Sequence, residues 1–382
     1  MTIGSAYSIF GSTVPINRYP PPIPQIWPSL DEKVMISGNL LQDPLVQESW
    51  EYVRSVVDPA LLAIPPSSYI QLASVSYHSD PAKTCYWSFN HCVRYTDTKD
   101  FKADIVNCPN RNDWGLTYDD GPSQNAGGSD TAGIHSALKA LNWKATFFII
   151  GSNLMLNKND MLIRAHQEGH QIGLHTWSHH PMTSLTNEQI VAEMKYTEAL
   201  IYRTIGVVPK YFRPPYGDID DRVRAIVAAL GYRTVLWSRD SGDTGISSSA
   251  LTNILSWNQP DQPGFISLQH DLTVATSRVA IQALSQFQAI PPTALKPQPV
   301  GSCLGDSNWY GGDGKNLVVT SAPTTTATTT TVVPTATFIV SLIAQPTLLP
   351  ADTTKASAAN QSGSSCVLIP ILIGLVQHLL FQ

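Results

Sequence analysis

The chain has 382 residues, of which 43% are hydrophobic and only 14% are charged. This length and apolar content allow one large domain with appendages, or two modest domains, around a sizeable core. The formal net charge is -5 and no long basic cluster occurs, which argues against nucleic acid as a partner. The acidic balance also disfavours polyanionic substrates.

Residues 1–107 differ in character from the middle of the chain. They are rich in proline, for example at Pro20, Pro21 and Pro22, and show little sustained periodicity. We therefore expect an irregular N-terminal extension that lies on the main domain or leads into it. The first ten residues lack the basic and apolar regions of a signal peptide, so none is evident there.

The cysteines indicate the compartment. The chain has five, at Cys85, Cys92, Cys108, Cys303 and Cys366, and none forms a CxxC pair, so a cysteine zinc site is not expected. Cys366 lies in an apolar tail that we expect to be removed. The other four suit disulfides in an oxidising compartment. Three pairings are open; we favour Cys85–Cys92 and Cys108–Cys303, with free buried thiols as the alternative.

Between residues 114 and 288, short β-rich runs alternate with helix-like stretches. The expected strands are Gly115–Tyr118, Ala145–Ile150, Gln171–Leu174, Lys210–Phe212, Thr234–Trp237 and Gly264–Leu268. The expected helices are Asp130–Asn142, Asp160–Glu168, Asn187–Ile205, Ile219–Leu230, Ser248–Trp257 and Ala275–Phe287. Such alternation predicts a parallel sheet with helices outside, and this number of units favours an incomplete (β/α) barrel over an open sheet.

Acids, histidines and one arginine follow the expected strands. They are Asp119, Asp120, His175, His179, Arg213, Asp240 and His270. In a parallel α/β barrel the carboxyl ends of the strands share one face, and active sites lie there. Residues scattered along the chain would therefore converge on one pocket.

His175 and His179 are the strongest candidates for metal ligands. A helical turn would place two side chains four residues apart on the same side. Two histidines and one carboxylate are a common catalytic zinc set, and we assign Asp120 as the third ligand. Taken alone, the histidine spacing would favour two surface histidines; their position at a strand end and the acids and arginine at the other strand ends reverse this judgement.

Hydrolysis of an amide also needs a base and an acid. We assign Asp119 as the base and His270 as the acid. A carboxylate such as Asp240 would raise the pKa of His270, and Arg213 would hold Asp119 ionised. The alternative for Arg213 and Asp240 is a structural ion pair. Asp119-Asp120-Gly121-Pro122 also predicts a tight turn, which is compatible with both roles.

Together these residues resemble the NodB-type polysaccharide deacetylase family. The matching segments are Thr117-Tyr118-Asp119-Asp120-Gly121-Pro122, His175-Thr176-Trp177-Ser178-His179, Arg213-Pro214-Pro215-Tyr216-Gly217, Trp237-Ser238-Arg239-Asp240 and Leu268-Gln269-His270-Asp271. The resemblance implies a distorted, incomplete, TIM-like (β/α) barrel of about seven strands. It also implies a divalent metal, Zn2+ or alternatively Co2+.

The resemblance also implies a role for each matching residue. Asp120, His175 and His179 would hold the metal, with Asp119 as base, His270 as acid, and Arg213 and Asp240 as supporting charges. The backbone N–H of Tyr216 would stabilise the oxyanion and contact the substrate. Trp237 and Leu268 would line the slot for the acetyl methyl group, with ordinary core packing as the alternative.

The C-terminal part predicts attachment to the cell surface. Ser302–Tyr310 is similar to the tail of fungal chitin deacetylases, and the Thr-rich tract after it predicts an O-glycosylated stalk or a plain linker. Small residues followed by an apolar end match a glycosylphosphatidylinositol (GPI) anchor signal, with a tail-anchored helix as the alternative. The expected domains are an extension at 1–107, a catalytic domain at 108–303, a stalk at 304–362 and an anchor signal at 363–382.

The resemblance implies hydrolysis of N-acetyl groups of chitin or chitin oligomers to chitosan and acetate, in cell-wall remodelling. Alternatives are a deacetylase of peptidoglycan or acetylxylan, or a surface protein that binds glycan without turnover. We expect a secreted monomer at the cell surface, held to the plasma membrane or cell wall by the GPI anchor.

Overall fold

The computed structural model describes residues 20–156, 158–245, 249–291 and 294–311. Most of the predicted stalk and the whole predicted anchor signal lie outside these ranges. Among the helices within them, none combines the length and the apolar character needed to cross a bilayer.

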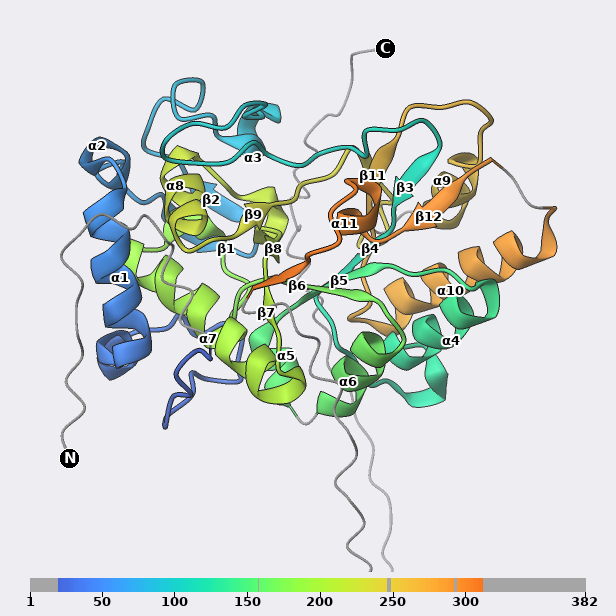
Figure 1. Cartoon of the computed structure of the whole chain (residues 1–382), viewed down its shortest axis with the longest axis horizontal. Helices are drawn as coiled ribbons and strands as arrows, with labels where there is room; N and C mark the ends of the chain where they lie inside the picture. Colours follow the sequence, from blue (N-terminus) through green and yellow to red (C-terminus); the bar gives the residue numbers. More distant parts are fainter. Residues whose placement is uncertain (1–19, 157, 246–248, 292–293, 312–382) are drawn as a thin grey trace, which may run out of the picture. The chain divides into compact units, whose positions relative to one another are not determined.

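Two parallel sheets form the centre of the described part (Figure 1). The larger sheet has the strand order β4-β5-β6-β8-β9, and the smaller has the order β10-β11-β3-β12. Their bounds are β3 Asp113–Gly115, β4 Thr117–Asp119, β5 Thr146–Ile149, β6 Gln171–Leu174, β8 Tyr211–Phe212, β9 Arg233–Thr234, β10 Arg239–Asp240, β11 Phe265–Leu268 and β12 Lys296–Gln298. Each predicted strand overlaps an observed one, and β6 has the predicted bounds.

The two sheets join into a distorted barrel. Only Leu116 separates β3 from β4, so this run contributes to both sheets. A parallel bridge between Asp119 and His270 links the end of β4 to the end of β11. On the other side, the chain passes from β9 to β10, and Ser238 N donates to Ile266 O in β11. The predicted α/β class and distorted barrel are confirmed.

The helices lie around the strands. Their bounds are α4 Thr131–Leu141, α5 Gly151–Met155, α6 Asn159–Gln167, α7 Asn187–Ile205, α8 Asp221–Ala229, α9 Ala250–Ser256, α10 Val274–Ala289 and α11 Val300–Cys303, with 3-10 turns η2 Ala126–Gly128, η3 Met182–Ser184 and η4 Pro215–Gly217. The longest, α7, has the predicted bounds because Thr186 and Gln189 form a capping box and Gly206 ends it in a left-handed conformation.

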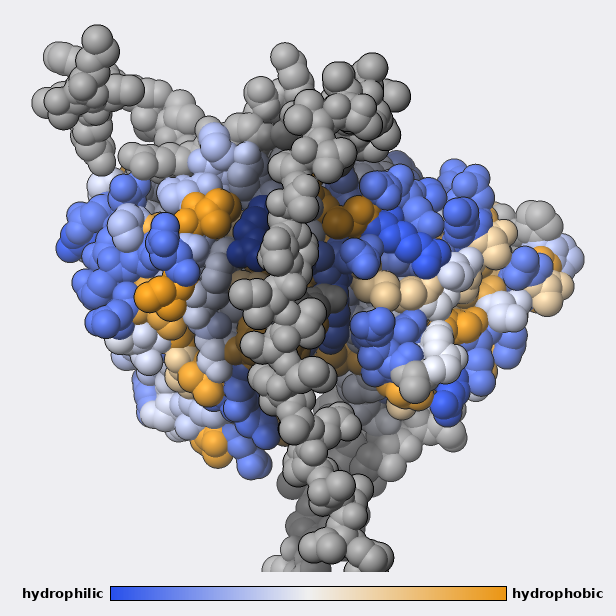
Figure 2. Space-filling view, turned by 90° about the horizontal axis from the view of Figure 1, so that it is seen from below, coloured by the Kyte–Doolittle hydropathy of each residue, from blue (hydrophilic) through white to orange (hydrophobic). Residues whose placement is uncertain are grey.

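The barrel core is apolar on both sides of the strands. Strands β4, β5 and β6 are buried along their whole length, as expected for parallel strands covered on both faces. Ile190, Met194, Thr197 and Ile201 on α7, which the periodicity places on one face, are all fully buried. On the surface in Figure 2, hydrophobic residues occur in small groups separated by hydrophilic ones.

The described part of the N-terminal extension is more regular than the proline-rich sequence suggested. It contains η1 Gly38–Gln42, α1 Pro44–Val56, α2 Pro59–Leu62, the antiparallel pair β1 Ser68–Gln71 and β2 Ser74–Ser76, and α3 Trp87–Asn90. A second short antiparallel pair joins β7 Val208–Pro209 to β13 Tyr310–Gly311. Asp43 caps α1 by accepting from Leu45 N, and Val46, Trp50 and Val53 bury one side of the helix in the main core.

Both favoured disulfides are present. Cys85 pairs with Cys92, which closes a short loop in the extension. Cys108 pairs with Cys303 across 195 residues and joins the beginning of the barrel to its end. The prediction of four paired cysteines is confirmed.

Candidate metal centre and active site

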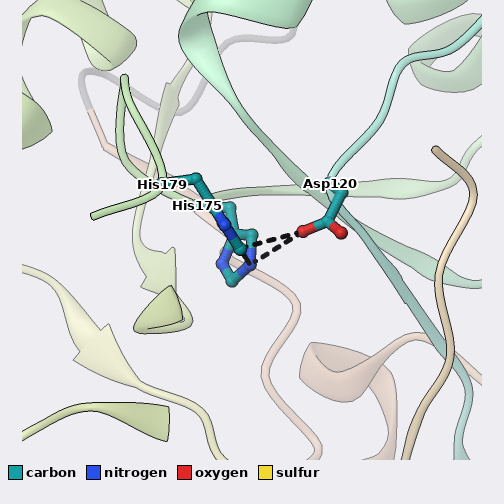
Figure 3. A group of neighbouring side chains, drawn as sticks. All are labelled: Asp120, His175 and His179. Carbon is teal, nitrogen blue, oxygen red and sulfur yellow. Dashed lines mark hydrogen bonds and ion pairs between the residues drawn. The ribbon is translucent and has the colours of Figure 1, made fainter. Parts of the chain in front are cut away.

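Three predicted metal ligands meet at the carboxyl ends of β4 and β6 (Figure 3). Asp120 directly follows β4, and His175 directly follows β6. Asp120 Oδ1 lies 3.3 Å from His175 Nε2 and 3.1 Å from His179 Nε2. The two Nε2 atoms are 3.2 Å apart. The structure therefore brings one oxygen and two nitrogen atoms together within the reach of one cation.

The two histidines lie on a loop, so the expected helical turn is wrong. Residues 175–181 have no helical hydrogen bonds, and Thr176 and His179 adopt left-handed backbone conformations with φ of +65° and +57°. His179 N donates to Thr176 Oγ1, which closes the turn between the histidines. The four-residue spacing brings the imidazoles together through this turn.

The environment of these atoms fits a bound cation. Asp120 Oδ1 is buried without a hydrogen-bond partner of good geometry, although two imidazole nitrogens lie beside it. His175 Nδ1 lies 2.7 Å from the backbone oxygen of Arg213, which fixes Nδ1–H as the donor and leaves Nε2 free for a metal. His179 Nδ1 is 3.1 Å from Tyr216 Oη. One carboxylate and two imidazoles suit Zn2+ and leave a position open.

Asp119, the candidate base, lies between Arg213 and the predicted metal ligands. Its Oδ1 accepts a hydrogen bond of 2.8 Å from Arg213 Nη1, and both side chains are buried. Arg213 also donates to Thr117 Oγ1 and to the backbone oxygen of Leu236. Asp119 Oδ2 lies 3.9 Å from His175 Nε2, on the side of the metal ligands. The expected pairing of Arg213 with Asp119 is therefore present.

The partner of His270 differs from the expected one. Asp243, not Asp240, lies beside it: His270 Nδ1 is 2.7 Å from Asp243 Oδ1, and His270 N donates to Asp243 Oδ2. Asp240 is exposed and accepts from Gly242 N. The chain turns after β10, so Asp240 points to solvent while Asp243, three residues later, reaches the strand end. Asp240 keeps only an electrostatic influence on Arg213.

The charges around His270 favour its protonated form. Burial lowers the pKa of this imidazole, but the hydrogen bond to Asp243 and the negative charges of Asp120, Asp243 and Asp119 outweigh it. Together they raise the pKa to about 10. Burial also opposes ionisation of Asp120, yet the neighbouring His179 and His175 hold the pKa of that carboxyl well below its usual value.

The remaining predicted residues lie on segments at or after β8, β9 and β11. Tyr216 lies in η4 with a φ of +59°, and its ring contacts His179. Trp237 is partly buried beside the Arg213 guanidinium and meets the edge of Trp87. Leu268 is buried at the end of β11. Their predicted contacts with the oxyanion and the acetyl group stay predictions.

Two further residues support the site in ways that the sequence analysis did not assign. Asp271 is buried and accepts from Gly121 N at 2.9 Å, so it fixes the turn that carries Asp120. A Cβ on Gly121 would come within 2.2 Å of the Asp271 carboxylate, so a larger residue there would displace this contact. Trp87, from the extension, packs against Gly217 and Trp237. The Asp120-Gly121 pair indicated a tight turn at the place where Asp271 binds, but no sequence pattern indicated the packing of Trp87.

The strand ends of this α/β barrel bring together an Asp-His-His cluster, a second carboxylate and a third imidazole. Metal-assisted hydrolysis uses groups of these kinds. Residues 106–235 match the model of the family described as polysaccharide deacetylase. This part of the chain is a polysaccharide deacetylase domain, as the resemblance implied.

Similar proteins include several fungal ones. The chain is 40% identical over 242 residues to chitin deacetylase 1 of Cryptococcus neoformans, covering 58% of this chain and 48% of that protein. It is 36% identical over 259 residues to chitin deacetylase of Amylomyces rouxii, covering 66% and 57%. The chain thus spans about half the length of these relatives. A chitin deacetylase structure from Colletotrichum lindemuthianum has 26% identity and a TM-score of 0.48, covering 55% of this chain and 95% of that one.

Proposed function

We propose that the protein removes N-acetyl groups from N-acetylglucosamine units of chitin, giving chitosan and acetate. The observation that carries the proposal is the meeting of Asp120, His175 and His179 beside two charged pairs, Asp119–Arg213 and His270–Asp243. The similarity to chitin deacetylases of two fungi supports chitin as the substrate. A role in cell-wall remodelling is part of the same proposal.

The residues divide the proton transfers between them. Arg213 occupies Asp119 Oδ1, so Oδ2 is the atom that takes a proton from the attacking water. Asp243 occupies His270 Nδ1, so Nε2 carries the proton that the departing glucosamine nitrogen receives. The Tyr216 N–H would donate to the oxyanion, and Trp237 and Leu268 would contact the acetyl methyl group. A divalent cation, when bound, supplies Lewis-acid activation of the water and the carbonyl.

Acetate release tests the activity and the metal requirement together. The purified protein with added Zn2+ is expected to release acetate from defined chitin oligomers, with each event lowering the product mass by one acetyl group in mass spectrometry. Treatment with a chelator should abolish release, and Zn2+ or Co2+ should restore it, because the cation held by Asp120, His175 and His179 would supply the Lewis-acid activation.

Two other outcomes would identify the alternatives. Release of acetate from acetylxylan or peptidoglycan but not from chitin would identify that other acetylated glycan as the substrate. Absence of release from every acetylated glycan, with retained binding to one of them, would favour a non-catalytic surface protein.

We also propose that the protein is secreted and held at the cell surface by a GPI anchor. The two disulfides support an oxidising compartment. The Thr-rich tract and the apolar end of the sequence support the stalk and the anchor signal, although both lie beyond the described residues. A phosphatidylinositol-specific phospholipase should release the protein from intact cells; retention after this treatment would contradict the anchor.

A further inference from the structure

The loop that carries both histidine ligands has an unfavourable backbone. Thr176 and His179 both lie in the left-handed region, and neither is a glycine. A residue with a side chain adopts this conformation only where surrounding contacts hold it there. Something outside the loop must therefore fix the spacing of His175 and His179.

A buried carboxylate on α7 supplies this support. Glu193 is fully buried, and its Oε2 accepts from Trp177 N at 2.7 Å and from Ser178 N at 2.8 Å. Its Oε1 accepts from Ser178 Oγ at 2.5 Å, and that hydroxyl also lies 2.8 Å from His180 Nδ1. All the donors belong to the segment between the two ligands or next to it. Glu193 itself is absent from the group of metal-ligating side chains.

The other contacts of the loop provide no second acceptor for these backbone N–H groups among the described residues. The backbone oxygens of Thr176 and Trp177 are taken by Gly151 N and Ser152 N at the start of α5. The Trp177 ring packs on Trp27, and its Nε1 donates to the backbone oxygen of Ser29. In the part of the chain that the structure describes, the N–H groups of residues 177 and 178 both donate to Glu193.

We propose that Glu193 is a positioning residue of the metal centre. By holding the backbone between His175 and His179, it sets the distance between their Nε2 atoms and thereby the affinity for the cation. The inference rests on the proposed function only in requiring that the Asp120, His175 and His179 cluster binds a divalent cation.

The test is Glu193→Gln, which keeps the shape but places an NH2 donor where backbone N–H or hydroxyl donors converge. Metal-free protein is titrated with Zn2+ against a chromophoric chelator, and with Co2+ while its visible absorption is recorded. We expect about 10–100-fold weaker Zn2+ binding, the range for loss of residues that orient metal ligands, and an altered Co2+ spectrum.

Glu198→Gln is the matched control. Glu198 is equally buried on the same helix, but its partners are Lys195 and Tyr232, away from the histidine loop. It should destabilise the fold yet bind Zn2+ like the wild type. Unchanged binding in Glu193→Gln, or an equal loss in Glu198→Gln, would overturn the proposal.

A milder variant keeps the question answerable if Glu193→Gln fails to fold. Ser178→Ala removes one of the three contacts and is expected to weaken Zn2+ binding about 2–10-fold, the value of one hydrogen bond. Wild-type affinity in Ser178→Ala would then count against the proposal. Zn2+ binding is measured without substrate, so this test is independent of the proposed function. If the protein deacetylates no glycan but Glu193→Gln still weakens Zn2+ binding, the proposed function is refuted and this inference stands.

Discussion

Replacing His270 by alanine is expected to lower kcat by about 10²–10⁴ while the protein still binds Zn2+. His270 lies at the end of β11 opposite Asp119, but its ring is committed to Asp243 and is no member of the cation site. His179→Ala should lose both activity and metal, because it removes one of three ligand atoms. Acetate release and bound zinc, measured on the same preparations, separate the two results.

His166→Ala is a suitable control for these variants, because His166 lies on α6 against Tyr310, outside the site. It should keep both activity and metal. Equal loss of zinc from His270→Ala and His179→Ala would contradict the division between acid and ligand. Full activity of His270→Ala would remove this residue from the proton transfers.

Asp243→Asn is expected to move the alkaline limb of the kcat profile to lower pH by about 1–3 units. The acid acts only while it is protonated, so its contribution holds below its pKa and disappears as the pH rises through it. In the wild type, Asp243 is a principal cause of the raised pKa of His270. Asparagine keeps the shape but removes the negative charge, and so the pKa of His270 falls. The measurement is kcat for a chitin oligomer across the alkaline range.

Asp240→Asn is the matched control, since Asp240 is exposed and makes no hydrogen bond to His270. Its alkaline limb should coincide with that of the wild type. If Asp240→Asn shifted the limb and Asp243→Asn did not, the pairing seen in the structure would be wrong. The free energy of unfolding offers a second readout. The raised pKa of His270 stabilises the fold fully below about pH 6.5, and this contribution is lost as the pH rises through the pKa of the folded state.

Strand ends were the informative part of the sequence. Runs such as Ala145–Ile150 and Gln171–Leu174 are short and β-rich, and the second is followed at once by His175, so the strand and its ending are both visible in the pattern. Parallel pairing then forces Asp120 and His175 to the same edge, whatever the details of the loops. This is why the barrel and the Asp120, His175 and His179 cluster could be predicted.

Loop geometry could not be predicted in the same way. Two histidines four residues apart fit a helical turn and a left-handed loop equally well, and only the backbone angles at Thr176 and His179 distinguish them. Asp240 and Asp243 both follow the predicted strand Thr234–Trp237, and the turn at Gly242 decides which one reaches His270. Helix α1 had a visible signal in Asp43-Pro44 and the spacing of Val46, Trp50 and Val53, which the surrounding prolines obscured.

The Cys108–Cys303 bond has a mechanical consequence. A pull applied to the chain before Cys108 and after Cys303 would run through the sulfur atoms and would bypass the 194 residues enclosed between them. The barrel strands, with the residues at their ends, would carry none of that tension while the bond is intact. Reduction would place the whole load on the strand pairs and expose the catalytic geometry to it.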